Sequence, residues 1–381
     1  MAKAAVQRLP KEPQVALILP PNERFAKDYA NPRMEALLAA NNVSRFSPYT
    51  TVYGRSGNQP KSDLPYKDIT LGKKILTSSS ASYIKQLKKQ LSEQNPEIVE
   101  VMDSVKLLHG LRDFVRDKLK ASLVFRLSHD PSETDILRTS MQRYGLLKEC
   151  DAIFCESLYI RSRLLEGLDA MASDEELRRA VVVRDGITIP SRLPEKERLI
   201  VLAAPLKEKH GVRLFFDAIK MIFEQNDEWN VAVMGDDEIG YRDLMKSWDK
   251  GLAVRVRHLK NFDEKVRAEW FGKAGMVVLP QENERMASIA LEAMAHGAAV
   301  VASELPAMNE FTAKSAVSFR TRTPQSLSGL MMQMINDEVR WRRTGMSCRN
   351  QMQHFEQAEM VRQMDLARLN ALGVAISRYH A

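Results

Sequence analysis

The sequence predicts an α/β protein made of two doubly wound domains, each built on a parallel sheet. Short apolar runs alternate with longer amphipathic stretches along most of the 381 residues, as in strands joined by crossover helices. A break containing glycine and proline at Asp185–Glu197 interrupts this alternation near the middle, and a chain beyond roughly 250 residues tends to split its core. We therefore assign residues 1–190 to a first domain and 191–360 to a second. Residues 361–381 are expected to form a helix that packs back toward the first domain.

In the first half, the elements follow from the spacing of apolar residues. The segment Val43–Lys74 is rich in Ser, Gly, Pro, Tyr and Lys and is predicted to be a long loop or irregular insertion. The predicted strands are Val15–Leu19, Glu97–Met102, Leu123–Leu127, Ala152–Cys155 and Ala180–Val183, and the predicted helices are Ala81–Glu93, Leu107–Lys120 and Leu158–Leu168.

In the second half, the alternation is more regular. The predicted strands are Leu199–Ala203, Asn230–Met234, Val254–His258, Met276–Leu279 and Ala299–Ala302. The predicted helices are Gly211–Glu224, Ile239–Trp248, Asp263–Lys273, Ser288–His296 and Pro324 to about Asn336, followed by a charged helical region to Leu372. Two such domains form a cleft where the carboxyl ends of their strands face each other, and open α/β sheets bind ligands there.

Composition narrows the class of partner. The 44% hydrophobic and 28% charged fractions are those of a globular protein, and three cysteines are too few for a disulfide framework. We find neither a secretory signal nor an apolar run long enough to span a membrane, so we expect a cytoplasmic protein. The net charge of +7 favours an anionic partner: nucleic acid, an anionic membrane surface or a phosphorylated small molecule. Because no nucleic-acid-binding module is present, we expect no nucleic acid.

The most informative segment is Met276–Ser303, which reads as a buried strand, a polar loop, a helix, a turn and a second buried strand. Ser288 stands where a helix N-cap is expected, and Gly297 where the chain turns after the helix. A helix N-terminus presents unpaired N–H groups and partial positive charge, so this junction suits a diphosphate. Seven residues separate Glu284 from Glu292, and each carboxylate can accept hydrogen bonds from two neighbouring hydroxyls.

This segment resembles the signature of glycosyltransferase family 4. The likeness covers the Glu284–Glu292 spacing, the Ala293-Met294-Ala295-His296-Gly297 that follows, and Val300–Ser303. It implies a retaining enzyme with the GT-B fold, in which two Rossmann-like domains with parallel sheets face each other across a cleft. It also implies that Glu284 contacts the donor sugar, that Glu292 contacts the ribose, and that the diphosphate meets the backbone around Arg285, Met286, Ala287 and Ser288. The alternative for Glu292 is a solvated helix residue.

Weaker matches occur elsewhere. Ser128-His129-Asp130 resembles the family's His-Asp pair near the donor sugar, and the alternative for His129 is a capping or loop histidine. Met234-Gly235-Asp236 resembles a turn whose backbone approaches the nucleotide. Cys150–Ser157 resembles a structural strand of the family, with Ser157 capping the next helix. Val183–Ile187 resembles the turn that closes the first domain, with aspartate at 185 in place of the usual asparagine.

Two departures from the family pattern concern charge and the first strand. Aligned on Gly211, the positions of the family's diphosphate-binding arginine and lysine hold Pro205 and His210. Charge that builds on a leaving diphosphate needs compensating cations. The candidates are Lys207, Lys209, His210, Arg213 and Arg285, although Arg285 is as readily a surface arginine. The first strand runs into Pro20–Phe25, with no glycine before Gly54, so the acceptor end is unlike the family's.

By this resemblance the chain transfers a sugar from a nucleotide-diphosphate donor to a glycan, a lipid-linked or another hydroxyl acceptor. The attack takes place on the front face, beside His129. We expect a UDP-sugar rather than a GDP-sugar, no cofactor, and no metal because no Asp-X-Asp pair is present. The basic segment Lys73–Lys89 is predicted either to contact an anionic membrane peripherally or to be an ordinary surface helix with a core-facing stripe.

Two rival functions follow from the same residues. The missing arginine and lysine favour a catalytically degenerate accessory subunit that keeps the fold, whereas the retained glutamate pair argues against it. A sugar-nucleotide hydrolase or epimerase with the same fold is the second rival.

Overall fold

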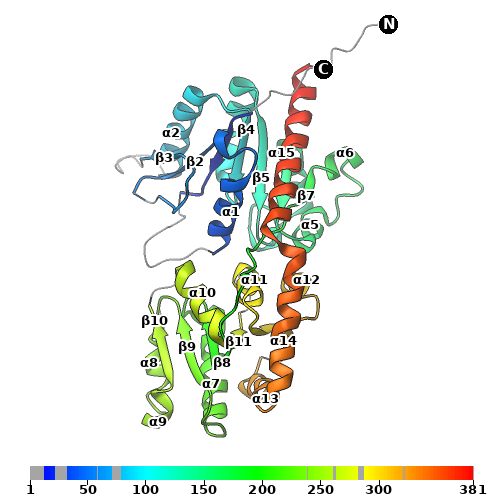
Figure 1. Cartoon of the computed structure of the whole chain (residues 1–381). Helices are drawn as coiled ribbons and strands as arrows, with labels where there is room; N and C mark the ends of the chain where they lie inside the picture. The colour runs from blue at the N-terminus through cyan, green and yellow to red at the C-terminus, as the bar shows by residue number, and fades with distance from the viewer. Residues whose placement is uncertain are drawn as a thin grey trace. The chain divides into compact units, whose positions relative to one another are not determined.

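The computed structural model describes residues 13–21, 32–57, 59–70, 79–237, 239–260, 263–281, 287–320 and 322–380. The chain divides into two compact units (Figure 1). Unit 1 consists of Met1–Arg24, Leu37–Arg184 and Met360–Ala381. Unit 2 consists of Phe25–Ala36 and Asp185–Glu359.

Unit 1 contains a seven-stranded sheet in the order β3-β2-β1-β4-β5-β6-β7, and every neighbouring pair is parallel. The elements from the first strand to the last are β1 (Val15–Ile18), α1 (Pro32–Val43), η1 (Ser47–Tyr49), β2 (Thr50–Arg55), β3 (Tyr66–Ile69), α2 (Ser79–Gln94), β4 (Ile98–Met102), α3 (Val105–Asp113), the π-helix η2 (Phe114–Leu119), β5 (Ser122–Leu127), η3 (Pro131–Glu133), α4 (Ser140–Glu149), β6 (Ala152–Cys155), α5 (Leu158–Leu165), α6 (Asp174–Leu177) and β7 (Ala180–Val182). The first turn of α1 belongs to unit 2.

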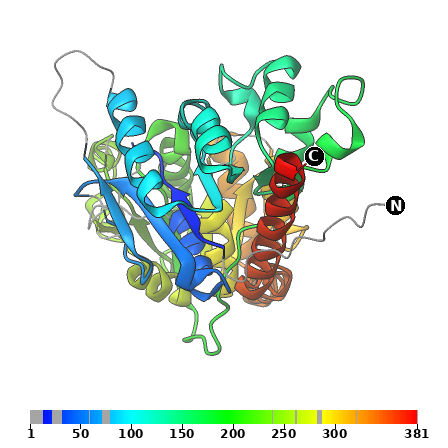
Figure 2. The same ribbon diagram turned by 90° about the horizontal axis from the view of Figure 1, so that it is seen from above.

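Helices cover both faces of this sheet. Strand β4 alternates: Val99 and Val101 point into the core formed with α2 and α3, whereas Glu100 points to the opposite face. There it meets the last helix of the chain, α15 (Gln357–His380), which is red in Figure 2. Arg368 of α15 donates to Glu100 from Nε at 3.0 Å and from Nη2 at 2.7 Å, and both side chains are fully buried. A buried ion pair thus joins the C-terminal helix to the centre of the sheet.

Unit 2 contains a six-stranded parallel sheet in the order β10-β9-β8-β11-β12-β13. Helices α7 and α13 bury apolar residues such as Phe215, Ile219 and Met331 against one face, and α10 and α11 contact strands of the same sheet. The remaining elements are β8 (Glu197–Ala203), η4 (Glu208–His210), α7 (Val212–Phe223), β9 (Asn230–Met234), α8 (Tyr241–Leu244), α9 (Lys250–Ala253), β10 (Val256–Leu259), α10 (Glu264–Lys273), β11 (Ala274–Leu279), α11 (Ala287–Ala295), β12 (Ala299–Ser303), α12 (Pro306–Thr312), β13 (Val317–Phe319), α13 (Pro324–Ile335), α14 (Glu338–Gln351) and η5 (Met352–Phe355).

The prediction of a long loop over Val43–Lys74 is wrong. That segment contains η1 and the strands β2 and β3, and β2 pairs in parallel with β1. Val52 and Tyr53 of β2 are fully buried, although they form an apolar run of only two residues in a polar segment. The helix predicted over Ile239–Trp248 is also too long, because only Tyr241–Leu244 is helical.

Candidate donor site

Helix α11, inside the segment that the sequence singles out, is buried from Ser288 to Ala295 and fixed at its C-terminus. Gly297 follows it with φ +72°, the left-handed conformation expected of a turn glycine. Lys196 Nζ donates to the carbonyl of His296 at 2.7 Å, and Arg349 Nη1 donates to that of Ala295 at 2.6 Å. Two cations therefore complement the negative end of the helix dipole. Ser288 lies within α11 (Ala287–Ala295) and is therefore not the predicted N-cap.

Glu292 lies on α11 with its carboxylate almost fully buried. Its Oε2 accepts a hydrogen bond from Arg267 Nε of α10 at 2.7 Å. Arg267 is itself buried, and its Nη2 donates to Oε2 of Glu35 at 2.6 Å, in the stretch of α1 that belongs to unit 2. Burial raises the pKa of Glu292 to about 7, although Arg267 opposes the shift. The alternative of a solvated helix residue is therefore wrong for Glu292.

Two glycines with positive φ allow the chain segments at the carboxyl ends of β8, β9 and β11 to lie close together. A Cβ on Gly211 would lie 2.1 Å from the carbonyl oxygen of Pro280, and one on Gly235 would lie 2.3 Å from that of Ala204. Such distances exclude any side chain, so both positions need glycine. Gly235 thus lies at the edge of the sheet where ligands of α/β folds bind.

The predicted cations at this edge differ in their surroundings. Lys207 is half-buried and His210 is buried, whereas Arg213 is exposed and paired with Glu208 at 2.6 Å. Predictions for Glu284, Arg285 and Met286 lie outside the described residues, as do those for the side chains of Lys209 and Ala287.

Arg322 is a cation at this edge that the sequence analysis did not single out. Its Nη2 donates to the carbonyl of Pro280 at 2.8 Å and its Nη1 donates to that of Gln281 at 2.9 Å, directly after β11. A cavity of about 270 Å³ adjoins it, lined by Ser303, Glu304, Leu305, Phe319, Arg320 and Arg322. The guanidinium thus holds the chain where it leaves the sheet toward α11.

His129 lies in unit 1, just after β5, beside an aspartate that follows β4. Its Nδ1 is 3.5 Å from Oδ1 of Asp103, and Asp103 also accepts hydrogen bonds from Ser128 N at 3.0 Å and Ser128 Oγ at 2.7 Å. Asp103 has φ +46°, which is uncommon for a residue other than glycine and is typical of functional sites. These contacts orient one ring nitrogen of His129 toward a carboxylate.

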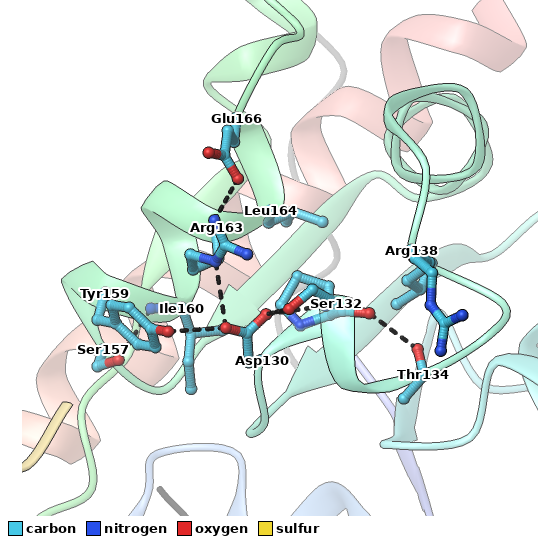
Figure 3. A network of polar contacts seen from close by, with 12 residues as sticks. Asp130, Ser132, Thr134, Arg138, Ser157, Tyr159, Ile160, Arg163, Leu164 and Glu166 are labelled. Atoms are coloured by element: carbon cyan, nitrogen blue, oxygen red, sulfur yellow. Dashed lines mark hydrogen bonds and ion pairs between the residues drawn. The ribbon is translucent and has the colours of Figure 1, made fainter. Parts of the chain in front are cut away.

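Asp130, the next residue, fixes the loop that carries His129 (Figure 3). Its Oδ1 accepts from the backbone N of Ser132 at 2.8 Å, and its Oδ2 accepts from Tyr159 Oη at 2.7 Å and Arg163 Nε at 3.1 Å. Burial alone would raise the pKa of Asp130, but these hydrogen bonds outweigh it and hold the pKa below its usual value. Asp130 is therefore an ionised anchor of the loop.

The basic segment of unit 1 is only partly described, because Lys73 and Lys74 lie outside the described residues. Tyr83, Leu87 and Leu91 of α2 are fully buried in the core of unit 1. The apolar stripe of this helix therefore packs against its own sheet. Within the described ranges, none of the helices is long and apolar enough to cross a bilayer, and no three His, Cys, Asp or Glu side chains gather as metal ligands.

Comparison with known proteins identifies the region that contains α11. Residues 197–337 match the sequence profile of the family described as glycosyl transferases group 1. The matched residues lie within unit 2. The matched region contains Glu292, Arg267, Gly235 and Arg322, whereas His129 lies outside it.

One curated protein and several solved structures are similar to larger parts of the chain. A glycosyltransferase of Methanocaldococcus jannaschii is 25% identical over 231 residues, which are 58% of this chain and 61% of that protein. The chain thus spans less than two thirds of the length of this curated relative. Among solved structures, HepE from Anabaena in complex with UDP and glucose has a TM-score of 0.69 at 14% identity and covers 93% of this chain and 98% of that one. Sucrose-phosphate synthase from Thermosynechococcus elongatus has a TM-score of 0.68 at 14% identity and covers 93% and 97%. These similarities extend over nearly the whole chain and show the GT-B fold.

Proposed function

We propose that the protein is a retaining glycosyltransferase that moves a sugar from a nucleotide-diphosphate donor to a hydroxyl of a glycan or lipid-linked acceptor without a metal ion. The observation that carries the proposal is the group 1 match, which encloses α11 and the Glu284–Glu292 spacing. We favour a UDP-sugar because the structurally similar HepE was crystallised with UDP-glucose.

In this proposal, the N-terminus of α11 receives the diphosphate, because a helix N-terminus presents unpaired N–H groups and a partial positive charge. Glu292 accepts hydrogen bonds from the ribose and Glu284 orients the sugar. The acceptor oxygen bonds to the anomeric carbon as the bond to the leaving phosphate breaks on the same face. The acceptor's proton passes to that phosphate, and His129 lies beside the reacting atoms. The protein supplies positioning and electrostatics.

The test begins with a thermal-shift screen against UDP-, GDP-, ADP- and TDP-sugars, because a ligand that binds only the folded state raises its stability. Glu284→Gln and Glu292→Ala should each reduce donor binding or turnover by about tenfold or more, the loss of roughly one hydrogen bond to a charged group. Unchanged kinetics in both variants would remove the basis for the proposal. The anomeric configuration of the product, read by NMR, tests retention, and activity in EDTA tests metal independence.

A second candidate is an accessory subunit without turnover. It is favoured by Pro205 and His210, which stand where the family has its diphosphate-binding cations. A wild-type protein that neither binds nor turns over any of these sugar nucleotides would support this candidate. Release of free nucleotide without an acceptor would instead indicate a hydrolase.

A further inference from the structure

The buried ion pair between Arg267 and Glu292 uses only part of the carboxylate. Oε2 of Glu292 accepts from Arg267 Nε at 2.7 Å, and Oε1 has no hydrogen-bond partner among the described residues. The side chain of Glu292 keeps 7% of its surface exposed. A carboxylate oxygen in this position keeps its capacity to accept from a ligand hydroxyl.

Arg267 cannot move freely, because a second carboxylate holds its other edge. Its Nη2 donates to Glu35 at 2.6 Å, and the side chain of Arg267 is only 2% exposed. A planar guanidinium bound on two edges fixes the rotamer of each partner it contacts. Burying an ion pair costs desolvation energy, so the pair contributes little net stability. Stability alone therefore does not account for the pairing of Arg267 with Glu292.

We propose that Arg267 is a positioning residue of the donor site: it holds Glu292 by one oxygen and leaves the other to accept hydrogen bonds from the ribose of the nucleotide. The inference rests on the proposed function. A ligand-binding side chain must be held within a fraction of an ångström by its neighbours, and Arg267 does this for Glu292.

The ion pair makes donor binding depend on pH in a defined direction. Only the ionised carboxylate accepts from both ribose hydroxyls, so affinity should rise as the pH rises through the pKa of Glu292, which is about 7. Burial is the largest effect and raises this pKa, and Glu35 and Glu264, at the start of α10, raise it further, whereas Arg267 lowers it. Removing Arg267 should therefore move the midpoint of the binding curve to higher pH, and removing the charge of Glu264 should move it to lower pH.

Other charged groups on the elements packed around α11 are placed differently. Lys196 and Arg349 bind carbonyls at the far end of the helix, and the Nδ1 of His296 lies 2.9 Å from the carbonyl oxygen of Glu292. Glu310 of α12 is half-buried, and His354 of η5 is exposed. Within the part of the chain that the structure describes, Arg267, Glu35 and Glu264 are the charges that shift the pKa of Glu292.

The experiment measures the Kd of UDP-glucose by calorimetry between pH 5.5 and 9 for the wild type, Arg267→Met, Arg267→Lys and Glu264→Gln. UDP-glucose is chosen because it lacks the free phosphate monoester proton that titrates at about pH 6. We expect Arg267→Met to weaken binding about tenfold at pH 7 through loss of a charge-assisted hydrogen bond, with a midpoint at higher pH. Arg267→Lys should restore part of the affinity, and Glu264→Gln should move the midpoint to lower pH.

Arg342→Met is the matched control, because Arg342 is half-exposed and paired with Glu338 on α14. It should leave both Kd and midpoint unchanged. If Arg267→Met lowers only the melting temperature while Kd and midpoint stay at wild-type values, the inference is overturned. If Arg267→Met does not fold, an unmoved midpoint in Glu264→Gln overturns it instead. A wild type that binds none of the sugar nucleotides overturns the proposed function and the inference together.

Discussion

The C-terminal helix should depend on one buried arginine for its attachment to unit 1. Arg368 makes two hydrogen bonds to Glu100 and one to Asn41 Oδ1 at 2.9 Å, and it is fully buried. Methionine is close in length and shape, so Arg368→Met removes the charge and the hydrogen bonds while leaving only a small cavity. The change therefore isolates the polar contribution of Arg368.

The magnitude follows from what Glu100 retains. Removing one partner of a buried ion pair costs about 3–5 kcal/mol. Glu100 keeps Arg126, whose Nε donates to Oε1 at 2.9 Å, so we take the lower end, about 3 kcal/mol. For a unit of this size, that corresponds to a decrease in Tm of about 6–12 °C. Adding Glu100→Gln to Arg368→Met should recover part of the loss, because it removes the buried charge that the single change leaves underpaired.

The assay can distinguish the two units. All four tryptophans, at 229, 248, 270 and 341, belong to unit 2, so their fluorescence reports on unit 2 while far-UV circular dichroism reports on the whole chain. Arg368→Met should lower the urea midpoint seen by circular dichroism more than the fluorescence midpoint, and should speed hydrogen exchange in peptides that cover β4. Leu366→Ala, at a half-exposed position of the same helix, is the control and should cost about 0.5 kcal/mol or less. An Arg368→Met midpoint equal to that of the control would refute the reasoning.

Two further predictions concern the edges of the sheets. Gly211→Ala should destabilise unit 2 by about 2 kcal/mol or more, since the new Cβ meets a carbonyl oxygen and the backbone has φ +69°. Gly329→Ala, in open space on α13, should be neutral or stabilising, and equal tryptophan-fluorescence midpoints for the two variants would contradict the prediction. Asp103→Asn should lower the rate of sugar transfer roughly tenfold, which is less than the full contribution of a group that donates or accepts a proton. The Kd of the donor should stay unchanged. Transfer at the wild-type rate would show that Asp103 does not orient His129.

The sequence predicted the fold of unit 2 well, for a physical reason. Strands buried on both faces of a parallel sheet are continuous apolar runs, and Asn230–Met234 was predicted with its observed bounds. Predictions failed where the apolar signal was short. Strand β2 has Val52 and Tyr53 between polar residues, and β13 (Val317–Phe319) has three residues. Both lie toward the edge of their sheets, and only pairing with a neighbouring strand reveals them.

The candidate site was predicted unevenly. The spacing of Glu292 and the glycines at 211 and 235 could be read from local patterns. Arg267 could not, because its partners lie 25 and 232 residues away. One signal was available: Arg267 and Phe271 are four residues apart and share the buried face of the predicted helix Asp263–Lys273. A charged residue on the core face of a helix needs a partner, and a search for that partner leads to α11.

The buried arginines Arg368 and Arg267 differ in whether they leave an oxygen of the paired carboxylate able to accept a hydrogen bond from a ligand. This difference separates a structural role from a functional one. In unit 1, both oxygens of Glu100 accept hydrogen bonds, one from Arg126 and the other from Arg368, and the carboxylate has no exposed surface. No acceptor capacity remains for a ligand, so that cluster fixes the position of α15. In unit 2, Oε2 of Glu292 accepts a hydrogen bond from Arg267, and Oε1 has no hydrogen-bond partner among the described residues. Burial by itself raises the pKa of both acids. For Glu100, two guanidinium groups outweigh burial and lower the pKa, whereas for Glu292 burial outweighs the single guanidinium group and raises the pKa to about 7. A carboxylate that is half-satisfied and poised near neutral pH suits a binding site, and one that is fully satisfied suits a core.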